Sequence, residues 1–511
     1  MAVAVRSRRR PPPDHRAHSK QDAAAWLGLS SRTLLAALVL LGAAIRFSTL
    51  GEQSFWYDEA TTHAIVAQGL GHVLSAVPQT ESTPPLYYMW LWLWAQLFGH
   101  GEVGLRSFSA LCGTLTIPVL WAIGRRLFCE RAGLIAALLT AVNPFLFWYS
   151  QEARSYSLLL LLSALSLLAL VRALELPGLG RVLAWGLVSA VALGAHYFAA
   201  FVLVPEAVWL LISLLRSGQL TAARVALGCG PILLVAGSLV PLAAHQNDGR
   251  AGYIATMGGS IPHRLAQLVK QDIIGDGQPH KVLLGLLGAA LVVVALVLLL
   301  RRGSRNERVG APLPAAIGCG GVLLAIIVAA GGRDYINTRN MLATWPAFAL
   351  LTAAGLGVRR AGRVGGLIAA LLSVLCVYCV SNVIRDPALQ RDDWRGAAHA
   401  LGPLTGPRAI VADRYTGLVS LQAYLGGVGD YPAGAPPVRE IDVIWLGRGT
   451  FGNPIILVKP LALPGFELRE IRTSSYIVVQ YRASRPAPEA AGALLALYPQ
   501  STNATALLQQ P

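Results

Sequence analysis

The sequence contains few charged residues. Only 13% of its 511 residues are Asp, Glu, Lys or Arg, whereas 54% are hydrophobic and the mean hydropathy is +0.54. This composition lies outside the range of ordinary soluble proteins and is typical of a chain that crosses a membrane many times. The net charge of +16 comes mostly from arginines in short clusters between apolar segments, with no basic face that carries interleaved aromatics. We therefore expect no nucleic-acid partner.

Cysteines are also scarce, and all of them lie in or beside apolar segments. Their positions form neither a disulfide framework nor a zinc-binding pattern. Cys376 and Cys379 are one helical turn apart, and within a membrane-spanning helix we expect them to pack as small apolar side chains. No internal repeat is evident. The six cysteines are Cys112, Cys129, Cys229, Cys319, Cys376 and Cys379.

Lys and Arg are absent from residues 51–105, although five acidic residues occur there. The first apolar segment, residues 34–50, follows a basic tail, which by the positive-inside rule holds the N-terminus in the cytoplasm. Residues 51–105 then form an acidic loop on the outer face. Arg46 is expected to snorkel toward the membrane surface at the end of this segment. A cleaved signal peptide is the alternative for residues 34–50, but no clear cleavage site follows.

Residues 84–98 are apolar and rich in Trp and Tyr, but they are too few to cross a bilayer comfortably. We predict that they lie along the outer surface as an amphipathic helix. The arginine clusters of the later loops then alternate as the positive-inside rule requires, with about eleven spans between residues 34 and 384. Residues 34–50 are the first predicted span, and the others are 106–123, 132–149, 155–171, 182–198, 199–215, 225–244, 281–300, 312–330, 341–358 and 364–383.

The two ends of the chain differ from the apolar middle. Residues 1–33 are polar and rich in Arg and Pro, which predicts a disordered cytoplasmic tail. Residues 385–511 gain Asp, Pro and Gly and predict a small extracytoplasmic α/β domain. A helix is expected to open near Asp392, followed by β-rich runs at 409–412, 441–446 and 475–481. The fold class is therefore an all-α polytopic membrane protein with a small α/β domain at its C-terminus.

The adjacent carboxylates Asp58 and Glu59 follow an aromatic lead-in in the first outer loop. A carboxylate beside a membrane suits a general base that takes a proton from a hydroxyl, or a ligand for Mg²⁺ or Mn²⁺. Cations in the later outer loops suit a lipid phosphate. A solvated turn or a helix N-terminus explains an isolated Asp-Glu pair equally well. The interpretation therefore depends on both charge sets meeting at the outer rim of the bilayer.

Five motifs occur in a characteristic order, and together they resemble the GT-C membrane glycosyltransferases. The resemblance is to the bacterial branch similar to protein O-mannosyltransferases and the lipid A aminoarabinose transferase, and it covers roughly residues 34–384. It implies a polyprenyl-phosphate-linked sugar as donor and inverting transfer to a hydroxyl acceptor on the extracytoplasmic face. The motifs are Trp56–Glu59, Ser82–Tyr88, Leu105–Leu111, Gly124–Phe128 and Trp148–Tyr156.

The resemblance also implies roles for particular residues. Asp58 matches the candidate base with Glu59 beside it, and Glu152 matches a second acidic position, or is replaced in that role by Arg154. A divalent cation, Mg²⁺ or Mn²⁺, is a further possibility, with Asp58 and Glu152 as its ligands. Thr83 stands where such proteins often carry His or Lys. The remaining candidates are Arg154, Lys270, Arg333 and Arg339 for the donor phosphate, and Glu81, Tyr87, His196 and Tyr197 for the substrate.

Several alternatives remain open for these residues and for the chain. Glu152 and Arg154 can pair with each other as an interfacial cap, and Lys270 lies on an amphipathic segment that suits anionic lipid headgroups. The aromatics from Tyr87 to Trp94 suit an interface anchor as well as a sugar platform. Besides an enzyme of the plasma membrane acting on a glycan, lipid or protein of the cell envelope, the chain can be a flippase for lipid-linked sugars or a scaffold. Few charges occur at span centres, with Glu206 the main exception, which disfavours a transporter.

Overall fold

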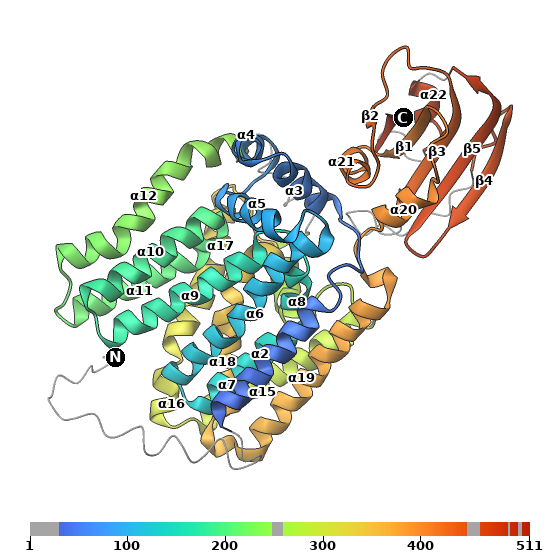
Figure 1. The fold of residues 1–511 in the computed structure, drawn as a ribbon. Coiled ribbons are helices and arrows are strands. Elements are labelled where there is room, and N and C mark those ends of the chain that lie inside the picture. Colours follow the sequence, from blue (N-terminus) through green and yellow to red (C-terminus); the bar gives the residue numbers. More distant parts are fainter. Residues whose placement is uncertain (1–29, 248–258, 447–459, 489–490, 499–502) are drawn as a thin grey trace. The chain divides into compact units, whose positions relative to one another are not determined.

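The computed structural model describes residues 30–247, 259–446, 460–488, 491–498 and 503–511 (Figure 1). Its contacts divide the chain into two compact units. The helical unit takes in residues up to 48, 74–91 and 106–381, and the sheet unit takes in 49–73, 92–105 and 382–511. The sheet unit thus combines two pieces of the first loop with the C-terminal part of the chain. Most of the predicted tail 1–33 lies outside the described residues.

Long helices account for most of the described chain up to residue 385. They begin with α2, whose N-cap Ser30 accepts a hydrogen bond from the backbone of Thr33. The helices are α2 Ser31–Phe47, α3 Tyr57–Ala67, α4 Leu70–Thr80, α5 Leu86–Phe98, α6 Glu102–Leu127, α7 Glu130–Val142, α8 Pro144–Ser150, α9 Tyr156–Glu175, α10 Leu179–Ala195, α11 Ala200–Arg216, α12 Ala222–Asn247, α14 Ile261–Ile274, α15 Lys281–Arg302, α16 Arg305–Val309, α17 Pro312–Ala330, α18 Trp345–Gly357 and α19 Gly362–Arg385, with the 3-10 turns η1 Tyr197–Ala199, η2 Thr338–Thr344 and η3 Arg359–Ala361.

Within the described residues, seven helices are long and apolar enough to cross a membrane, or eight if α7 and α8 form one bent span. The chain is therefore a membrane protein with several apolar helices, as predicted. Three of the other predicted spans correspond to shorter helices, α2 and α10 with 17 residues each and α18 with 13. The count of about eleven stays a prediction. The segment 84–98, for which a helix along the outer surface was predicted, contains the 13-residue helix α5, and the segment around Lys270 is the helix α14.

The predicted continuous span 132–149 is instead broken into α7 and α8, which meet at an angle of 56°. Pro144 ends the hydrogen-bond ladder of α7 and occupies the first turn of α8, where a missing N–H costs nothing. Arg46 supplies the lost donors: its guanidinium binds the carbonyls of Thr140 at 2.7 Å and Ala141 at 2.8 Å. The prediction that Arg46 snorkels outward is therefore wrong. Its side chain is completely buried because the broken helix leaves backbone carbonyls that need donors.

The C-terminal part of the sheet unit is built on one six-stranded sheet in the order β2-β6-β1-β3-β5-β4. β1 and β3 are parallel, with Ala409 opposite Ile441, and every other neighbouring pair is antiparallel. The predicted runs 409–412, 441–446 and 475–481 are found in β1, β3 and β5, whereas β2, β4 and β6 were not predicted. The strands are β1 Arg408–Asp413, β2 Val428–Asp430, β3 Val438–Leu446, β4 Phe466–Arg472, β5 Tyr476–Ala487 and β6 Ala504–Gln509.

Successive side chains of the central strands lie alternately in two apolar clusters, because side chains along a strand point to opposite faces of the sheet and both faces are covered. Ala409 and Val411 belong to one cluster, and Ile410 and Ala412 belong to the other. The second cluster also contains Trp394, which is 1% exposed and lies on the helix predicted to open near Asp392. The helical elements of this part are η4 Pro387–Leu389, α20 Trp394–Ala400, α21 Gly417–Gln422 and α22 Ala491–Leu495. The small α/β character expected for this region is confirmed.

Candidate active site

A buried ion pair joins Glu81 and Arg154 in the helical unit. Arg154 lies in the turn between α8 and α9, and Glu81 lies between α4 and α5. The two terminal guanidinium nitrogens bind the two carboxylate oxygens at 2.7 Å each, and the side chains are 10% and 4% exposed. Ser109 of α6 donates to the backbone carbonyl of Arg154. This forked geometry holds the guanidinium plane in one orientation. The sequence left a pair of Arg154 with Glu152 open as an alternative, and the structure shows a forked pair of Arg154 with Glu81.

The Pro-Pro motif beside Glu81 is held by a glutamine from a distant helix. Gln246 of α12 donates to the carbonyls of Val77 at 3.2 Å and Thr83 at 3.1 Å, and it accepts a hydrogen bond from the hydroxyl of Tyr197 at 2.8 Å. Tyr87 is completely buried. Its ring packs edge-on against Tyr88, with centroids 5.1 Å apart. Tyr197 thus helps, through Gln246, to fix the loop that carries Glu81.

His196, at the end of α10, carries a buried hydrogen-bond donor. Its Nδ1 accepts a hydrogen bond from the backbone N–H of Phe198, which assigns the ring proton to Nε2. Nε2 is buried and has no hydrogen-bond partner among the described residues. The pKa of His196 is lowered to about 3, chiefly by burial and to a smaller extent by the positive charges of Arg154 and Arg339. His196 is therefore a neutral N–H donor within the electric field of two arginines.

Arg339 lies in the turn η2, which Asn337 caps by accepting a hydrogen bond from the backbone N–H of Arg339 at 3.2 Å. Its side chain is half-buried. A continuous row of aromatic rings passes His196, with centroid separations of 5.0 Å for Tyr149 and Tyr156 and 5.6 Å for Tyr156 and His196. These rings form a rigid wall beside the polar groups. The other members of the row are Phe145, Phe198, Phe201 and Tyr335.

Two other predicted cations and Glu152 also belong to the helical unit. Lys270 of α14 is half-buried, and its pKa is lowered chiefly by burial. Arg333 is exposed. Glu152 is 1% exposed and lies two residues before Arg154. An ion pair that the sequence did not reveal joins Arg264 of α14 to Asp334, and a guanidinium nitrogen of Arg264 also donates to the carbonyl of Ile336 at 3.0 Å. This pair holds the turn after α17 against α14.

The proposed base belongs to the sheet unit. Asp58 and Glu59 are in the first turn of α3, where the helix dipole stabilises negative charge. Asp58 is half-buried and Glu59 is completely buried. The helix-terminus explanation that the sequence left open thus applies to both residues, and it is compatible with a chemical role for Asp58. It stays a prediction that Asp58 and the arginines of the helical unit serve one site.

Among the residues that the structure describes, there is no group of three or more His, Cys, Asp or Glu side chains that could hold a metal ion. The carboxylates Asp58 and Glu152, predicted as ligands, are not part of such a group. Stable binding of Mg²⁺ or Mn²⁺ needs several oxygen ligands at one point. We therefore derive no chemical step through a divalent cation.

The helical unit also contains an apolar cavity of about 470 Å³. Its walls come from α7, α14, α15, α17, α18 and α19, mostly Leu, Val and Ile side chains. Asp272 of α14 is one of the few polar groups in its lining, and its backbone carbonyl accepts hydrogen bonds from Asn143 at 2.9 Å and Trp345 at 3.1 Å. Burial raises the pKa of Asp272 well above its usual value. The sequence did not reveal this cavity because its lining residues look like those of ordinary spans.

Comparisons with known proteins agree with this architecture. The family model described as dolichyl-phosphate-mannose-protein mannosyltransferase matches residues 82–240, a segment that includes Arg154 and His196. Comparison with curated protein sequences gives no match. ArnT from Cupriavidus metallidurans in the apo state has the same fold, with a TM-score of 0.55 and 15% identity over 90% of this chain and 100% of that one. The same protein bound to undecaprenyl phosphate gives a TM-score of 0.53 and 16% identity, over 92% and 100%.

The chain therefore has the fold of a GT-C membrane glycosyltransferase. The resemblance predicted from its motifs is confirmed by the matching family model and by the shared fold of ArnT.

Proposed function

We propose that this protein is an inverting glycosyltransferase that moves a sugar from a polyprenyl-phosphate donor to a hydroxyl acceptor. The observation that carries this proposal is the buried Nε2–H of His196, which has no hydrogen-bond partner in the part of the chain that the structure describes and feels the charges of Arg154 and Arg339. A neutral donor within the electric field of two guanidinium groups is suited to the oxygens of a phosphate.

The leaving phosphate is stabilised by these three donors in the proposed reaction. Arg154, whose guanidinium is oriented by Glu81, and Arg339 each supply positive charge to the phosphate oxygens. His196 adds one hydrogen bond without adding charge. Lys270 and Arg333 supply further positive charge for the donor. Glu152, Tyr87 and Tyr197 are assigned to the support of this site and to contacts with the sugar.

The lipid tail of the donor is proposed to occupy the apolar cavity of about 470 Å³ in the helical unit. A polyprenyl chain is a flexible hydrocarbon, and burial of its surface contributes about 25 cal/mol per Å². The relative with the same fold has been solved with undecaprenyl phosphate, which supports a lipid of this chemistry. The cavity adjoins α14, the helix that also carries Lys270.

The acceptor hydroxyl is activated by Asp58 in this proposal. Its carboxylate takes the hydroxyl proton while the acceptor oxygen forms a bond to the anomeric carbon, and the bond from that carbon to the phosphate oxygen breaks. The phosphate leaves with the electron pair, so a single displacement inverts the anomeric centre. Glu59 is buried beside the base and helps to set the local charge. The acceptor is a glycan, lipid or protein of the cell envelope.

The proposed topology follows from the same reasoning. The N-terminus faces the cytoplasm, whereas the site and residues 385–511 are on the extracytoplasmic face of the plasma membrane. Residues 34–384 form the catalytic membrane domain, with 51–105 as its first outer loop. A reporter fused at the C-terminus is expected to report an extracytoplasmic position. A cytoplasmic signal would reverse this assignment.

The test is transfer by the purified protein from a panel of polyprenyl-phosphate sugars, beginning with mannose, arabinose and aminoarabinose. Asp58→Asn is expected to reduce kcat by at least about 100-fold, because general-base catalysis contributes roughly 10²–10⁴-fold. His196→Phe is expected to weaken the binding of undecaprenyl phosphate about tenfold, the effect of about one hydrogen bond to a charged group. Exposed Arg439→Gln serves as the control. Wild-type transfer by Asp58→Asn would remove the assigned base, and unchanged phosphate binding by His196→Phe would remove the carrying observation.

A further inference from the structure

The backbone just before the proposed base is held by the C-terminal part of the chain. Ser54 donates to the carbonyl of Asp392 at 2.8 Å, and the backbone N–H of Arg391 donates to the side chain of Gln53 at 3.0 Å. Arg395 of α20 donates to the carbonyls of Gly51 at 3.0 Å and Glu52 at 2.9 Å. These contacts fix residues 51–54 to a segment more than 330 positions later in the sequence.

Tyr424, which follows α21, completes this attachment. Its hydroxyl accepts a hydrogen bond from the backbone N–H of Phe55 and donates to Glu102 at 2.8 Å. Arg395 binds the same carboxylate oxygen of Glu102 at 3.2 Å. The ring of Phe55 packs beside the rings of Tyr424 and His63. One tyrosine hydroxyl therefore joins both pieces of the first loop that belong to the sheet unit.

The start of α3 is held by these distant contacts. Its N-cap residue, Trp56, makes no side-chain capping hydrogen bond. A helix whose first N–H groups lack a side-chain cap is free to fray unless tertiary contacts hold it. Phe55 is held directly before the cap, and Asp58 is only three residues further on. The backbone that leads into the first turn of α3, where Asp58 lies, is thus held from outside this helix.

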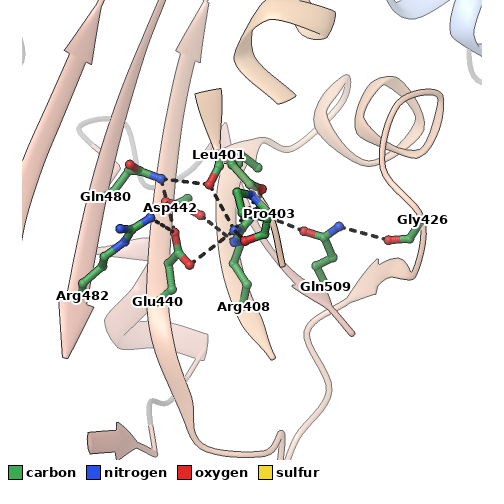
Figure 2. Close-up of polar contacts among 10 residues, drawn as sticks. Leu401, Pro403, Arg408, Gly426, Glu440, Asp442, Gln480, Arg482 and Gln509 are labelled. Carbon is green, nitrogen blue, oxygen red and sulfur yellow. Dashed lines mark hydrogen bonds and ion pairs between the residues drawn. The ribbon is translucent and has the colours of Figure 1, made fainter. Parts of the chain in front are cut away.

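The end of α20 is itself anchored by a buried charged cluster in the sheet. Figure 2 shows Arg408 of β1 reaching the carbonyls of Leu401 at 3.1 Å and Pro403 at 3.2 Å, just after α20. The guanidinium of Arg408 is also paired with Glu440 at 3.3 Å and Asp442 at 3.1 Å. The Arg408 side chain is 1% exposed, so this arrangement admits little movement. The sheet thereby fixes the helix that holds residues 51–54.

We propose that α20, α21 and Tyr424 form a clamp that positions Asp58 for catalysis, with Tyr424 and Arg395 as positioning residues. This inference rests on the proposed function of Asp58 as the base. It gives the C-terminal part of the chain a role in the chemical step, distinct from binding the acceptor. A misplacement of about 1 Å of a catalytic group is enough to cost roughly 100-fold in rate.

The test measures kcat and KM for Tyr424→Phe, Arg395→Gln and the exposed control Arg439→Gln, with the panel donor that wild type turns over fastest. Both clamp variants are expected to lower kcat at least about tenfold while the KM for the donor changes less than about twofold. Amide exchange of residues 51–59 should accelerate at least about tenfold in both variants, whereas the unfolding midpoint stays within about 2 °C of wild type. The control is expected to match wild type in all three measurements.

A double-mutant comparison separates this inference from the function on which it rests. If Tyr424 acts through Asp58, Tyr424→Phe causes no further loss of kcat in an Asp58→Asn background. Full activity of Asp58→Asn alone would overturn the proposed function. Two results would overturn the clamp alone, provided that Asp58→Asn is impaired. One is a fully active Tyr424→Phe. The other is a double variant whose loss of kcat equals the product of the two single losses. If no panel donor is turned over, unchanged amide exchange of residues 51–59 in both clamp variants overturns the clamp.

Discussion

The forked pair between Glu81 and Arg154 makes a quantitative prediction about stability. Both side chains are at most 10% exposed, and both oxygens of the carboxylate are engaged at 2.7 Å. Removal of one partner leaves the other charge buried without compensation, which costs about 3–5 kcal/mol. Arg154→Gln and Glu81→Gln are therefore each expected to destabilise the protein by about 4 kcal/mol. The double variant keeps two neutral hydrogen-bonding groups and is expected to lose less than either single variant.

The assay is thermal unfolding of the purified protein in detergent. With an unfolding entropy of about 2 cal/mol/K per residue over roughly 300 residues, each single variant should unfold about 6 °C below wild type. The exposed pair of Arg126 and Glu175, 2.8 Å apart, provides a matched control. Arg126→Gln should lower the midpoint by less than about 2 °C, because surface pairs contribute at most about 1 kcal/mol.

Two results would refute this reasoning. The first is a midpoint for Glu81→Gln that is indistinguishable from that of the Arg126→Gln control. The second is a double variant whose loss equals the sum of the two single losses, since residues in direct contact must show a coupling energy. Either result would mean that the pair does not hold Arg154 in the orientation proposed for the donor phosphate.

Three further predictions concern buried polar groups. Arg46→Leu is expected to lower the unfolding midpoint by several degrees and to accelerate amide exchange near the α7–α8 break, because the carbonyls of Thr140 and Ala141 lose their donors. The pKa of His196 is lowered from 6.5 to about 3, so between these pH values the unfolded chain binds a proton that the folded chain does not. The thermal unfolding midpoint should therefore fall as the pH decreases from 6.5 to 4. His196→Asn should make the midpoint less dependent on pH in this range. The pKa of Asp442 is raised, chiefly by burial, from 3.8 to about 7, so the folded chain binds the extra proton and stability falls as the pH increases. Protection of the β3 amides from exchange should therefore weaken between pH 4 and 7. Asp442→Asn should remove this pH dependence. A pH-independent midpoint in wild type would contradict the second prediction, and retention of the β3 slope by Asp442→Asn would contradict the third.

The sequence by itself determined the local elements. Long apolar runs separated by arginine clusters predict helices because backbone groups in a membrane must be paired within the segment, and the predicted ranges agree with α6, α9, α11, α12, α15, α17 and α19. Alternating β-branched and aromatic residues predicted three strands of the C-terminal sheet. The motif around Asp58 and the segment containing Arg154 were recognised from residue types and order alone.

Only the tertiary structure decided which distant residues meet. Glu81 became the partner of Arg154 across 73 positions, and Arg46 turned inward because a proline had broken another helix. The short strands β2, β4 and β6 exist because they pair with neighbours that are remote in sequence. The joining of residues 49–73 to the C-terminal part likewise depends on hydrogen bonds such as that from Ser54 to Asp392. Periodicity is a property of neighbouring residues, whereas the partner of a buried charge is chosen by packing of the whole chain.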